Sequence, residues 1–218
     1  NTANSTLNLT VNPVNDAPIA NNDINTTIED TQLVVNAANG VLSNDVDTEN
    51  DALTVTGFTI GGINFTTGNT ATITEGTIRL NTDGSYTFVP KLNFNGDVRD
   101  ITYTISDGNL TDTAILKITV TPTNDAPVAN ADTGSTNEDV ALNVNTANGL
   151  LSNDTDVEND PLTVTQFTVN GNTATAGSTV TLTEGVLVIN TDGSYTFSPA
   201  LNFNGTVPEI TYTISDGT

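Results

Sequence analysis

Hydrophobic and polar residues alternate over short stretches of the chain, and these stretches are rich in Val, Ile, Thr, Phe and Tyr. Such a pattern predicts β-strands, because successive side chains of a strand point to opposite faces of the sheet. No window carries apolar residues at helical spacing over more than one turn, so the pattern predicts no helix. In the first half of the chain it predicts seven strands, at residues 31–36, 53–60, 70–74, 77–81, 85–89, 101–106 and 113–120. Turn sequences such as "NTDG" at 81–84 and "SDG" at 106–108 separate them and predict hairpins.

The inward-facing positions of these strands form the candidate core. They are Leu53, Val55, Phe88, Ile101, Tyr103, Ile105, Leu116, Ile118 and Val120, with Phe94 covering one end. Tyr86, Tyr103 and Phe94 stand at a spacing that favours a core over a sugar-binding surface. Tyr103 is also a candidate for the tyrosine corner of a β-sandwich, in which the hydroxyl bonds the backbone nearby.

The 218-residue chain repeats itself at a shift of 109 positions without insertion. "LSNDVDTEND" at 42–51 returns as "LSNDTDVEND" at 151–160, and 61 of the 96 residues aligned between 14–109 and 123–218 are identical. Copies this similar share one fold, and a period of this size is that of an independent domain. Seven short strands in a domain of about 100 residues are typical of an immunoglobulin-like sandwich. The sequence therefore predicts an all-β protein of tandem immunoglobulin-like β-sandwich domains in a linear array.

The same period predicts the domain boundaries. "LNLTV" at 7–11 corresponds to "LKITV" at 116–120, so residues 1–13 are expected to be the last strand of a preceding repeat. Residues 14–122 then form one repeat, and residues 123–218 form a second repeat that lacks its own last strand. A sandwich without that strand offers a groove that a matching strand can fill. We therefore expect residues 6–11 of one molecule to insert into the second repeat of another copy, head to tail.

Charge and composition exclude several function classes. The chain has 26 acidic and 4 basic residues, a net charge of −22, so a nucleic-acid partner is not expected. No apolar run approaches the roughly 18 residues that a spanning helix needs, so direct membrane insertion is not expected either. Histidine and cysteine are absent, which removes the commonest general base, the best nucleophile and any disulfide. The chain is therefore expected not to be an enzyme.

Acidic residues gather at the same place in both copies. Four carboxylates fall within seven residues at Asp45, Asp47, Glu49 and Asp51, and again at Asp154, Asp156, Glu158 and Asp160. No basic residue lies nearby in the sequence, whereas calcium takes six to eight oxygen ligands. The spacing is not that of an EF-hand, since Asn50 stands where that loop needs glycine. The alternative is a solvated acidic loop with Asx-turns formed by Asn44 and Asn50.

The predicted topology strengthens the case for a metal. In such a sandwich the acidic loop, the "SDG" turn that holds Asp107 and the linker that holds Asp16 lie at one end. Three acidic segments far apart in sequence are therefore expected to converge in each copy, as a metal site requires.

The linker "NDAP", the acidic "NDVDTEND", the turn "DGSYTF", "NFNG" and the strand "YTISDG" recur in order in both copies. Together they resemble the bacterial cadherin-like, VCBS-type tandem repeats of large surface adhesins, over nearly the whole chain. The resemblance implies a calcium-stiffened string of β-sandwiches that is secreted and held outside a bacterial cell. Cadherins bind calcium (Ca2+) between domains, through an acid of one domain, an Asn-Asp linker and the acidic loops of the next.

Carried onto this chain, the resemblance implies two sets of calcium ligands. Those of the junction between the copies are Glu29, Asn124, Asp125, Asp154, Asp156, Asp160 and Asp216. Those of the upstream junction are Asp16, Asp45, Asp47, Asp51 and Asp107. The chain has no counterpart of the cadherin Asp-Arg-Glu sequence, so the resemblance does not fix the number of ions at each junction.

Two functions remain open. The repeats are either a structural extender, whose partners are the neighbouring repeats of the same chain, or an adhesive module that itself binds glycan or protein. Near identity of the copies favours the extender, because a specific pocket need not be duplicated without change. The longest divergent stretch, 57–80 against 166–189, is where a binding surface would vary most easily.

Overall fold

The structure is a computed structural model that describes all residues, 1–218. The chain divides into two compact units, Asn1–Thr123 (unit 1) and Asn124–Thr218 (unit 2). Helix is confined to three three-residue 3-10 turns, η1 (Ala37–Asn39), η2 (Thr146–Asn148) and η3 (Leu150–Ser152). The all-β prediction is therefore confirmed. None of these helical turns is long and apolar enough to cross a membrane.

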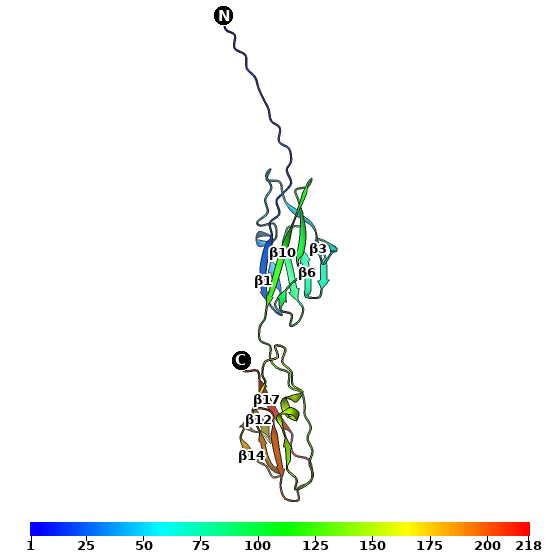
Figure 1. Cartoon of the computed structure of the whole chain (residues 1–218), viewed down its shortest axis with the longest axis vertical. Coiled ribbons are helices and arrows are strands. Elements are labelled where there is room, and N and C mark those ends of the chain that lie inside the picture. Colours follow the sequence, from blue (N-terminus) through cyan, green and yellow to red (C-terminus); the bar gives the residue numbers. More distant parts are fainter. The chain divides into compact units, whose positions relative to one another are not determined.

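Unit 1 is a sandwich of two β-sheets (Figure 1). Its strands are β1 (Asp23–Ile28), β2 (Leu33–Val35), β3 (Thr54–Ile60), β4 (Ile63–Thr66), β5 (Thr70–Ile73), β6 (Gly76–Leu80), β7 (Tyr86–Pro90), β8 (Gly96–Asp97), β9 (Ile101–Ser106) and β10 (Thr111–Thr121). One sheet has the order β1-β10-β9-β3-β4, with β8 also paired to β10, and the other has the order β2-β7-β6-β5. The pairs are antiparallel except for β1 and β10, which run in the same direction.

The core of unit 1 lies between these two sheets and contains almost all of the predicted residues. Val55, Phe88, Ile101, Tyr103, Ile105, Leu116, Ile118 and Val120 are buried, and Leu53 and Phe94 are partly buried against them. Strand β10 supplies one inward residue at every second position, as the alternating pattern requires.

Unit 2 repeats most of this architecture. Its strands are β11 (Leu142–Val144), β12 (Thr163–Val169), β13 (Asn172–Thr175), β14 (Thr179–Thr181), β15 (Gly185–Ile189), β16 (Tyr195–Pro199) and β17 (Ile210–Ser215). One sheet has the order β11-β16-β15-β14 and the other β13-β12-β17. Among residues 124–218 there is no counterpart of β10, and the segments that correspond to β1 and β8 are not strands.

Three strands of unit 1 lie outside the predicted set: β1, β4 and the two-residue β8. Strand β1 was not predicted, because its inward positions are the polar Asp23, Asn25 and Thr27, while Ile24 is 80% exposed. Strand β4 follows β3 across the tight turn at Gly61–Gly62, where both glycines have a positive φ.

The predicted 31–36 strand is shorter than expected, since it is confined to Leu33–Val35 in β2. Asn36 was predicted to end that strand but instead caps η1, and its side chain accepts a hydrogen bond from the Asn39 N–H.

The tyrosine-corner interpretation of Tyr103 is wrong. A tyrosine corner closes onto backbone a few residues upstream. The Tyr103 hydroxyl instead lies 2.7 Å from the carbonyl oxygen of Asn21 and 2.8 Å from Asp23 Oδ2, some 80 residues away in sequence. It therefore fixes the segment that leads into β1 against the core.

Candidate metal centre

Three acidic segments meet at one end of unit 1, which we call its acidic tip: residues 15–16, 45–51 and 107. The side-chain amide of Asn15 donates to Asp107 Oδ2 at 2.8 Å, and the Asp16 N–H donates to Glu49 Oε2 at 3.2 Å. The acidic loop is joined to the incoming chain by the Ile19–Val46 bridge. The predicted convergence of linker, acidic loop and "SDG" turn is therefore present within unit 1.

The acidic loop is shaped by its own carboxylates. Asp47 Oδ1 accepts the N–H groups of Glu49 at 3.0 Å and of Asp51 at 2.9 Å, which closes the loop into an Asx-type turn. Asn50 takes up a positive φ of 62° within this turn. Asp45 Oδ1 accepts the Asn21 N–H at 2.7 Å. The turn is therefore made by Asp47, whereas the alternative interpretation expected Asn44 and Asn50 to form it. Asp45 and Asp47 each use only one carboxylate oxygen in these bonds.

Unit 2 builds the same acidic tip from residues 124–125, 154–160 and 216. Asn124 donates to Asp216 Oδ2 at 2.7 Å, and the Asp125 N–H donates to Glu158 Oε2 at 3.3 Å. The Asp160 N–H donates to Asp156 Oδ1 at 2.9 Å, and Asp154 Oδ1 accepts the Asn130 N–H at 2.7 Å. Each contact reproduces its counterpart in unit 1.

The second carboxylate oxygens of the acidic loops are buried without a hydrogen-bond partner. In unit 1 these are Asp45 Oδ2 and Asp47 Oδ2, and in unit 2 they are Asp154 Oδ2, Asp156 Oδ2 and Glu158 Oε1. A buried charged oxygen without a partner is costly, unless a cation or another donor reaches it. Hard oxygen donors of this type suit calcium, so the donor set fits the metal that the sequence predicted.

Burial and like charge act on Asp45 in particular. Burial, with a smaller contribution from the nearby charges of Asp23 and Asp112, raises the pKa of Asp45 to about 6 against the opposing effect of the hydrogen bond from the Asn21 N–H. Without a counter-ion, the acidic tip therefore resists carrying its full negative charge.

Other predicted residues at the tips are already engaged or exposed. Asp107 Oδ1 accepts two backbone N–H groups, and these bonds lower the pKa of Asp107, as Asn124 and Thr218 do for Asp216. The side chains of Asp16 and Asp51 are exposed.

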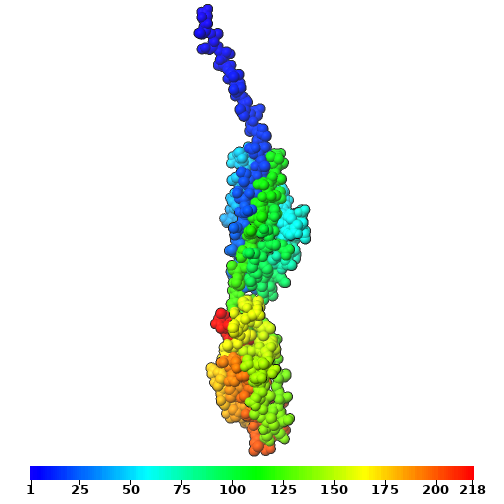
Figure 2. All heavy atoms as spheres, viewed as in Figure 1, coloured from blue at the N-terminus to red at the C-terminus, as the bar shows by residue number.

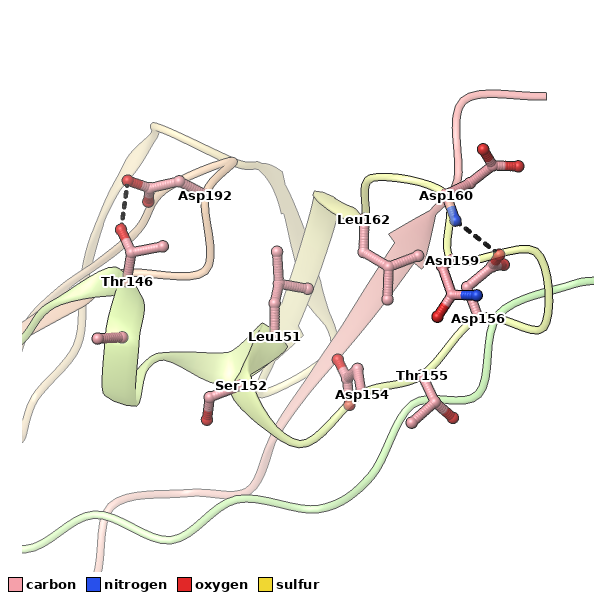
Figure 3. A pocket seen from close by; sticks show the side chains of 11 residues that line it. Thr146, Leu151, Ser152, Asp154, Thr155, Asp156, Asn159, Asp160, Leu162 and Asp192 are labelled. Atoms are coloured by element: carbon pink, nitrogen blue, oxygen red, sulfur yellow. Dashed lines mark hydrogen bonds between the residues drawn. The ribbon is translucent and has the colours of Figure 1, made fainter.

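In unit 2 the acidic loop borders a surface hollow of about 660 Å3 (Figure 3). Asp154, Asp156 and Asp160 line one side, and Asp192 lies on the other side beside Thr146. Asp192 already accepts hydrogen bonds from Ser194 and Thr146, which lower its pKa. No group of three or more acidic side chains in the structure is arranged to hold a metal ion unaided.

Glu29 lies apart from the acidic tip of unit 1, where the chain leaves that unit. It is 1% exposed, and its carboxylate accepts the Thr123 N–H at 2.5 Å and the Asn95 side chain at 3.3 Å. Thr123 directly precedes Asn124 and Asp125 in sequence, so Glu29 is held beside the start of the linker.

Sequence reasoning did not include Glu49 and Glu158 among the ligands, yet both accept the N–H of the linker aspartate in their unit. Each glutamate falls within the acidic cluster of its loop, so the sequence contains a signal for it. An Asp-x-Asp pattern, however, does not include glutamate.

The bacterial cadherin-like domain profile matches this chain twice, over residues 15–122 and 124–218. The chain belongs to the bacterial cadherin-like domain family. Both cadherin-like repeats are covered almost from end to end, as the resemblance in the sequence implied. No curated protein sequence is significantly similar to the chain.

A solved cadherin structure has a fold similar to that of these cadherin-like repeats. Human protocadherin-24 EC1-2 is 15% identical with a TM-score of 0.51, and the match covers 93% of both chains. An endo-fucoidan hydrolase of glycoside hydrolase family 107 is 20% identical with a TM-score of 0.33. That match covers 96% of this chain but only 28% of the hydrolase chain.

Proposed function

We propose that the chain is a structural extender: tandem repeats of a large secreted bacterial adhesin or surface filament, stiffened by calcium and without enzymatic activity. Its location is extracellular, at the bacterial cell surface, and its first partners are the neighbouring repeats of the same chain. Cadherin-like domains in general support an adhesive or extending role, and the calcium dependence is the specific part of the proposal.

One observation carries the calcium proposal: the buried carboxylate oxygens without partners recur at equivalent positions of both repeats. A pair such as Asp154 Oδ2 and Asp156 Oδ2 in unit 2 matches Asp45 Oδ2 and Asp47 Oδ2 in unit 1. A solvated acidic loop gains nothing from burying carboxylate oxygens away from water without a partner. A bound cation compensates both the lost hydration and the mutual repulsion.

The proposed ligands are the twelve residues implied by the family, together with Glu49 and Glu158. Calcium needs six to eight oxygens, more than the acidic side chains of one tip provide unaided. We therefore propose that Asn side-chain oxygens, backbone carbonyls and an acid of the neighbouring repeat complete the coordination. Glu29 is the candidate acid, because it is held beside the linker that leads to Asp125.

The burial of the aromatic rings supports a structural extender over a glycan-binding module. Sugar-binding surfaces present aromatic rings to solvent. All 7 Phe and 4 Tyr side chains of this chain are buried or partly buried, and Trp is absent. Phe58 and Phe65, in the stretch that diverges between repeats, stack on each other at 5.3 Å and pack on the core.

A calcium titration with matched variants tests the proposal. Calcium at about 100-fold over its Kd adds about 2.7 kcal/mol per site to the free energy of unfolding, so the melting temperature should rise. Small-angle scattering should show a narrower distribution of interdomain angles. If a chelator leaves both measurements unchanged, the calcium proposal is wrong.

Asp154→Asn and Asp192→Asn provide the comparison within unit 2. Both remove one charge beside the same hollow, but only Asp154 has a buried oxygen without a partner. Asp154→Asn should reduce the calcium-induced rise in melting temperature, and Asp192→Asn should leave it unchanged. If the two variants behave alike, calcium responds to the overall negative charge of this surface and not to the buried oxygen of Asp154.

A further inference from the structure

Strand β4 forms one edge of the larger sheet of unit 1. Across the turn at Gly61–Gly62, Ile60 and Ile63 close the hairpin with β3, and the positive φ values of both glycines are those of a type I′ turn. Hydrogen-bonded and non-bonded pairs alternate along antiparallel strands, so Asn64 and Thr66 direct their N–H and C=O groups away from β3. The Thr66 carbonyl also accepts the Asn69 N–H, but at 3.4 Å. Since no other strand pairs with this edge, its backbone groups are available to a partner.

This edge has none of the usual protections against pairing. Natural proteins protect edge strands with lysine, proline, an inward-pointing charge, a bulge or a very short strand. Strand β4 has the sequence INFT, and its register with β3 is continuous. By contrast, β1 at the other edge of the same sheet carries Asp23, and the edge strand β2 of the second sheet has only three residues. Strand β4 is therefore an edge that accepts a further strand.

The side of unit 1 that carries β4 is free of charge. Residues 52–74, which include β3, β4 and β5, and their counterparts 161–183 are the longest stretches of the chain without a charged residue. Residues 61–68, cyan in Figure 2, protrude at this side of unit 1. Directly after the first stretch, Glu75 is neutralised by its ion pair with Arg99. Two copies of a chain with a net charge of −22 repel each other, and they repel least where this side is turned toward the other copy.

Only unit 1 adds apolar side chains to this uncharged edge. Ile63 is 63% exposed although Ile60 opposite it is buried, and Phe65 stacks on Phe58 at the margin of the core. In unit 2 the equivalent strand β13 places the exposed Asn172 and the small Ala174 at the positions of Ile63 and Phe65. The two repeats thus share the uncharged edge but differ in its apolar residues. A partner for β4 must be an extended, neutral strand with an apolar residue, and β4 of a second copy meets this description.

We propose that β4 pairs antiparallel with β4 of a second copy of the chain, about a two-fold axis that passes between the two Phe65 residues. In this register Asn64 of each copy lies opposite Thr66 of the other, and the outward N–H and C=O groups of both residues bond across the interface. Two identical edges satisfy each other at once, as the symmetry of such a contact requires. The sheets of the two copies then become one continuous sheet.

The same register covers the exposed isoleucine. Ile63 lies opposite Thr67 of the second copy and diagonal to its Phe65, a separation within the reach of cross-strand packing. The contact joins molecules side by side and uses no acidic residue, so it requires no calcium. It therefore goes beyond the extender function, because it assigns unit 1 a role in the lateral association of chains.

Proline at an outward-facing position tests the pairing without removing a bond to β3. Asn64→Pro removes an N–H that points to the second copy, and Thr173→Pro makes the same change at the equivalent position of β13. In analytical ultracentrifugation with a chelator present, the unaltered chain and Thr173→Pro should dimerise alike, and Asn64→Pro should raise the Kd at least about 10-fold. Hydrogen exchange of Asn64 and Thr66 should slow as the concentration of the unaltered chain rises. Equal Kd values for the two proline variants overturn the proposal, as does an unaltered chain that stays monomeric at about 1 mM.

A second pair of variants changes only exposed side chains, so neither should unfold unit 1. Ile63→Asn introduces the residue that unit 2 carries at this position and should raise the Kd about 5-fold. Val34→Asn removes an equally exposed apolar side chain from β2 and should leave the Kd unchanged. Added salt should strengthen the dimer, because it screens the repulsion between the two acidic chains. A dimer that salt dissociates would instead join the exposed Arg79 and Lys91 to acidic residues of the other copy, and this result overturns the proposal.

Discussion

The two repeats share 61 of 96 aligned residues but differ in how completely their cores are closed. Ile101, Tyr103 and Ile105 of β9 are 0% exposed, whereas their counterparts in β17, which have the same sequence, are only partly buried. The difference is that β10 covers β9, while nothing among residues 124–218 covers β17. Burial of these residues is thus set by a strand from elsewhere in the chain.

The acidic tips show the opposite behaviour, because they are the same in both repeats. The amide-to-carboxylate bonds of Asn15 with Asp107 and of Asn124 with Asp216 measure 2.8 and 2.7 Å. The tip is therefore formed by its linker, its loop and the end of one strand, and it does not depend on β10. One contact is an exception: Asp112 of β10 accepts the Ala20 N–H at 2.9 Å in unit 1.

The largest expected change in stability comes from adding a last strand to unit 2 within the same chain. A copy of residues 110–122 after Thr218 should raise the free energy of unfolding of unit 2 by about 3 kcal/mol. Burial of three apolar side chains gives about 1.5–3 kcal/mol each, and ordering of the strand offsets part of this gain. Urea denaturation measures the gain, and hydrogen exchange should show new protection in β17 and residues 132–137. A copy with Asp at the positions of Leu116 and Ile118 is the control and should give no gain.

The two repeats carry a glutamate at equivalent positions, at the end opposite the acidic tip. The two glutamates differ in burial and therefore form a matched pair for mutation. Glu29→Ala removes a buried carboxylate and leaves the Thr123 N–H and the Asn95 side chain without their acceptor, so it should cost about 2 kcal/mol in the free energy of unfolding of unit 1. Glu138→Ala changes an exposed side chain and should cost less than about 0.5 kcal/mol. Denaturation in the presence of a chelator separates this effect from any metal binding. Equal costs would show that burial of Glu29 contributes nothing to stability.

The smallest expected effect on the free energy of unfolding concerns an ion pair that is present in unit 1 alone. Arg99 Nε donates to Glu75 Oε1 at 2.9 Å, whereas Pro208 stands at the position of Arg99 in unit 2. Burial alone would raise the pKa of Glu75, but hydrogen bonds from Arg99 and Thr74 lower it below 4.5. The folded state therefore gains stability from ionised Glu75 above this pH and loses it as the pH falls further.

Arg99→Gln should accordingly lower the free energy of unfolding by at most about 1 kcal/mol at neutral pH. The difference from the unaltered chain should shrink as the pH falls through the lowered pKa of Glu75 and the carboxylate is protonated. Denaturation curves from neutral pH down into the acidic range measure this difference. A difference that persists at the lower pH would point to lost packing of the Arg99 side chain.

The sequence predicted the strands whose inward positions are apolar and could not predict those that depend on a distant partner. Strands β9 and β10 carry their apolar residues at every second position, so their burial was visible in the pattern. Strand β1 places Asn25 inward, where its side chain donates to the Tyr86 hydroxyl at 2.9 Å. Only its parallel pairing with β10 makes this segment a strand, and such long-range pairing leaves no local signal.

At the candidate site, the sequence indicated which segments converge but not which oxygens stay without a partner. Repeated acids and the sandwich topology were enough to bring Asp16, Asp45 and Asp107 to one end. Which oxygen of Asp47 bonds the backbone and which is left buried depends on the loop conformation at Asn50.

Strand β1 and strand β10 run in the same direction and pair over six residues, from Asp23 with Leu116 to Ile28 with Thr121. The polypeptide enters this pair at the start of β1 and leaves it at the end of β10. Tension along the chain therefore shears the two strands past each other, and their hydrogen bonds must break together instead of unzipping in turn. Unit 1 thus contains a mechanical clamp between its points of attachment.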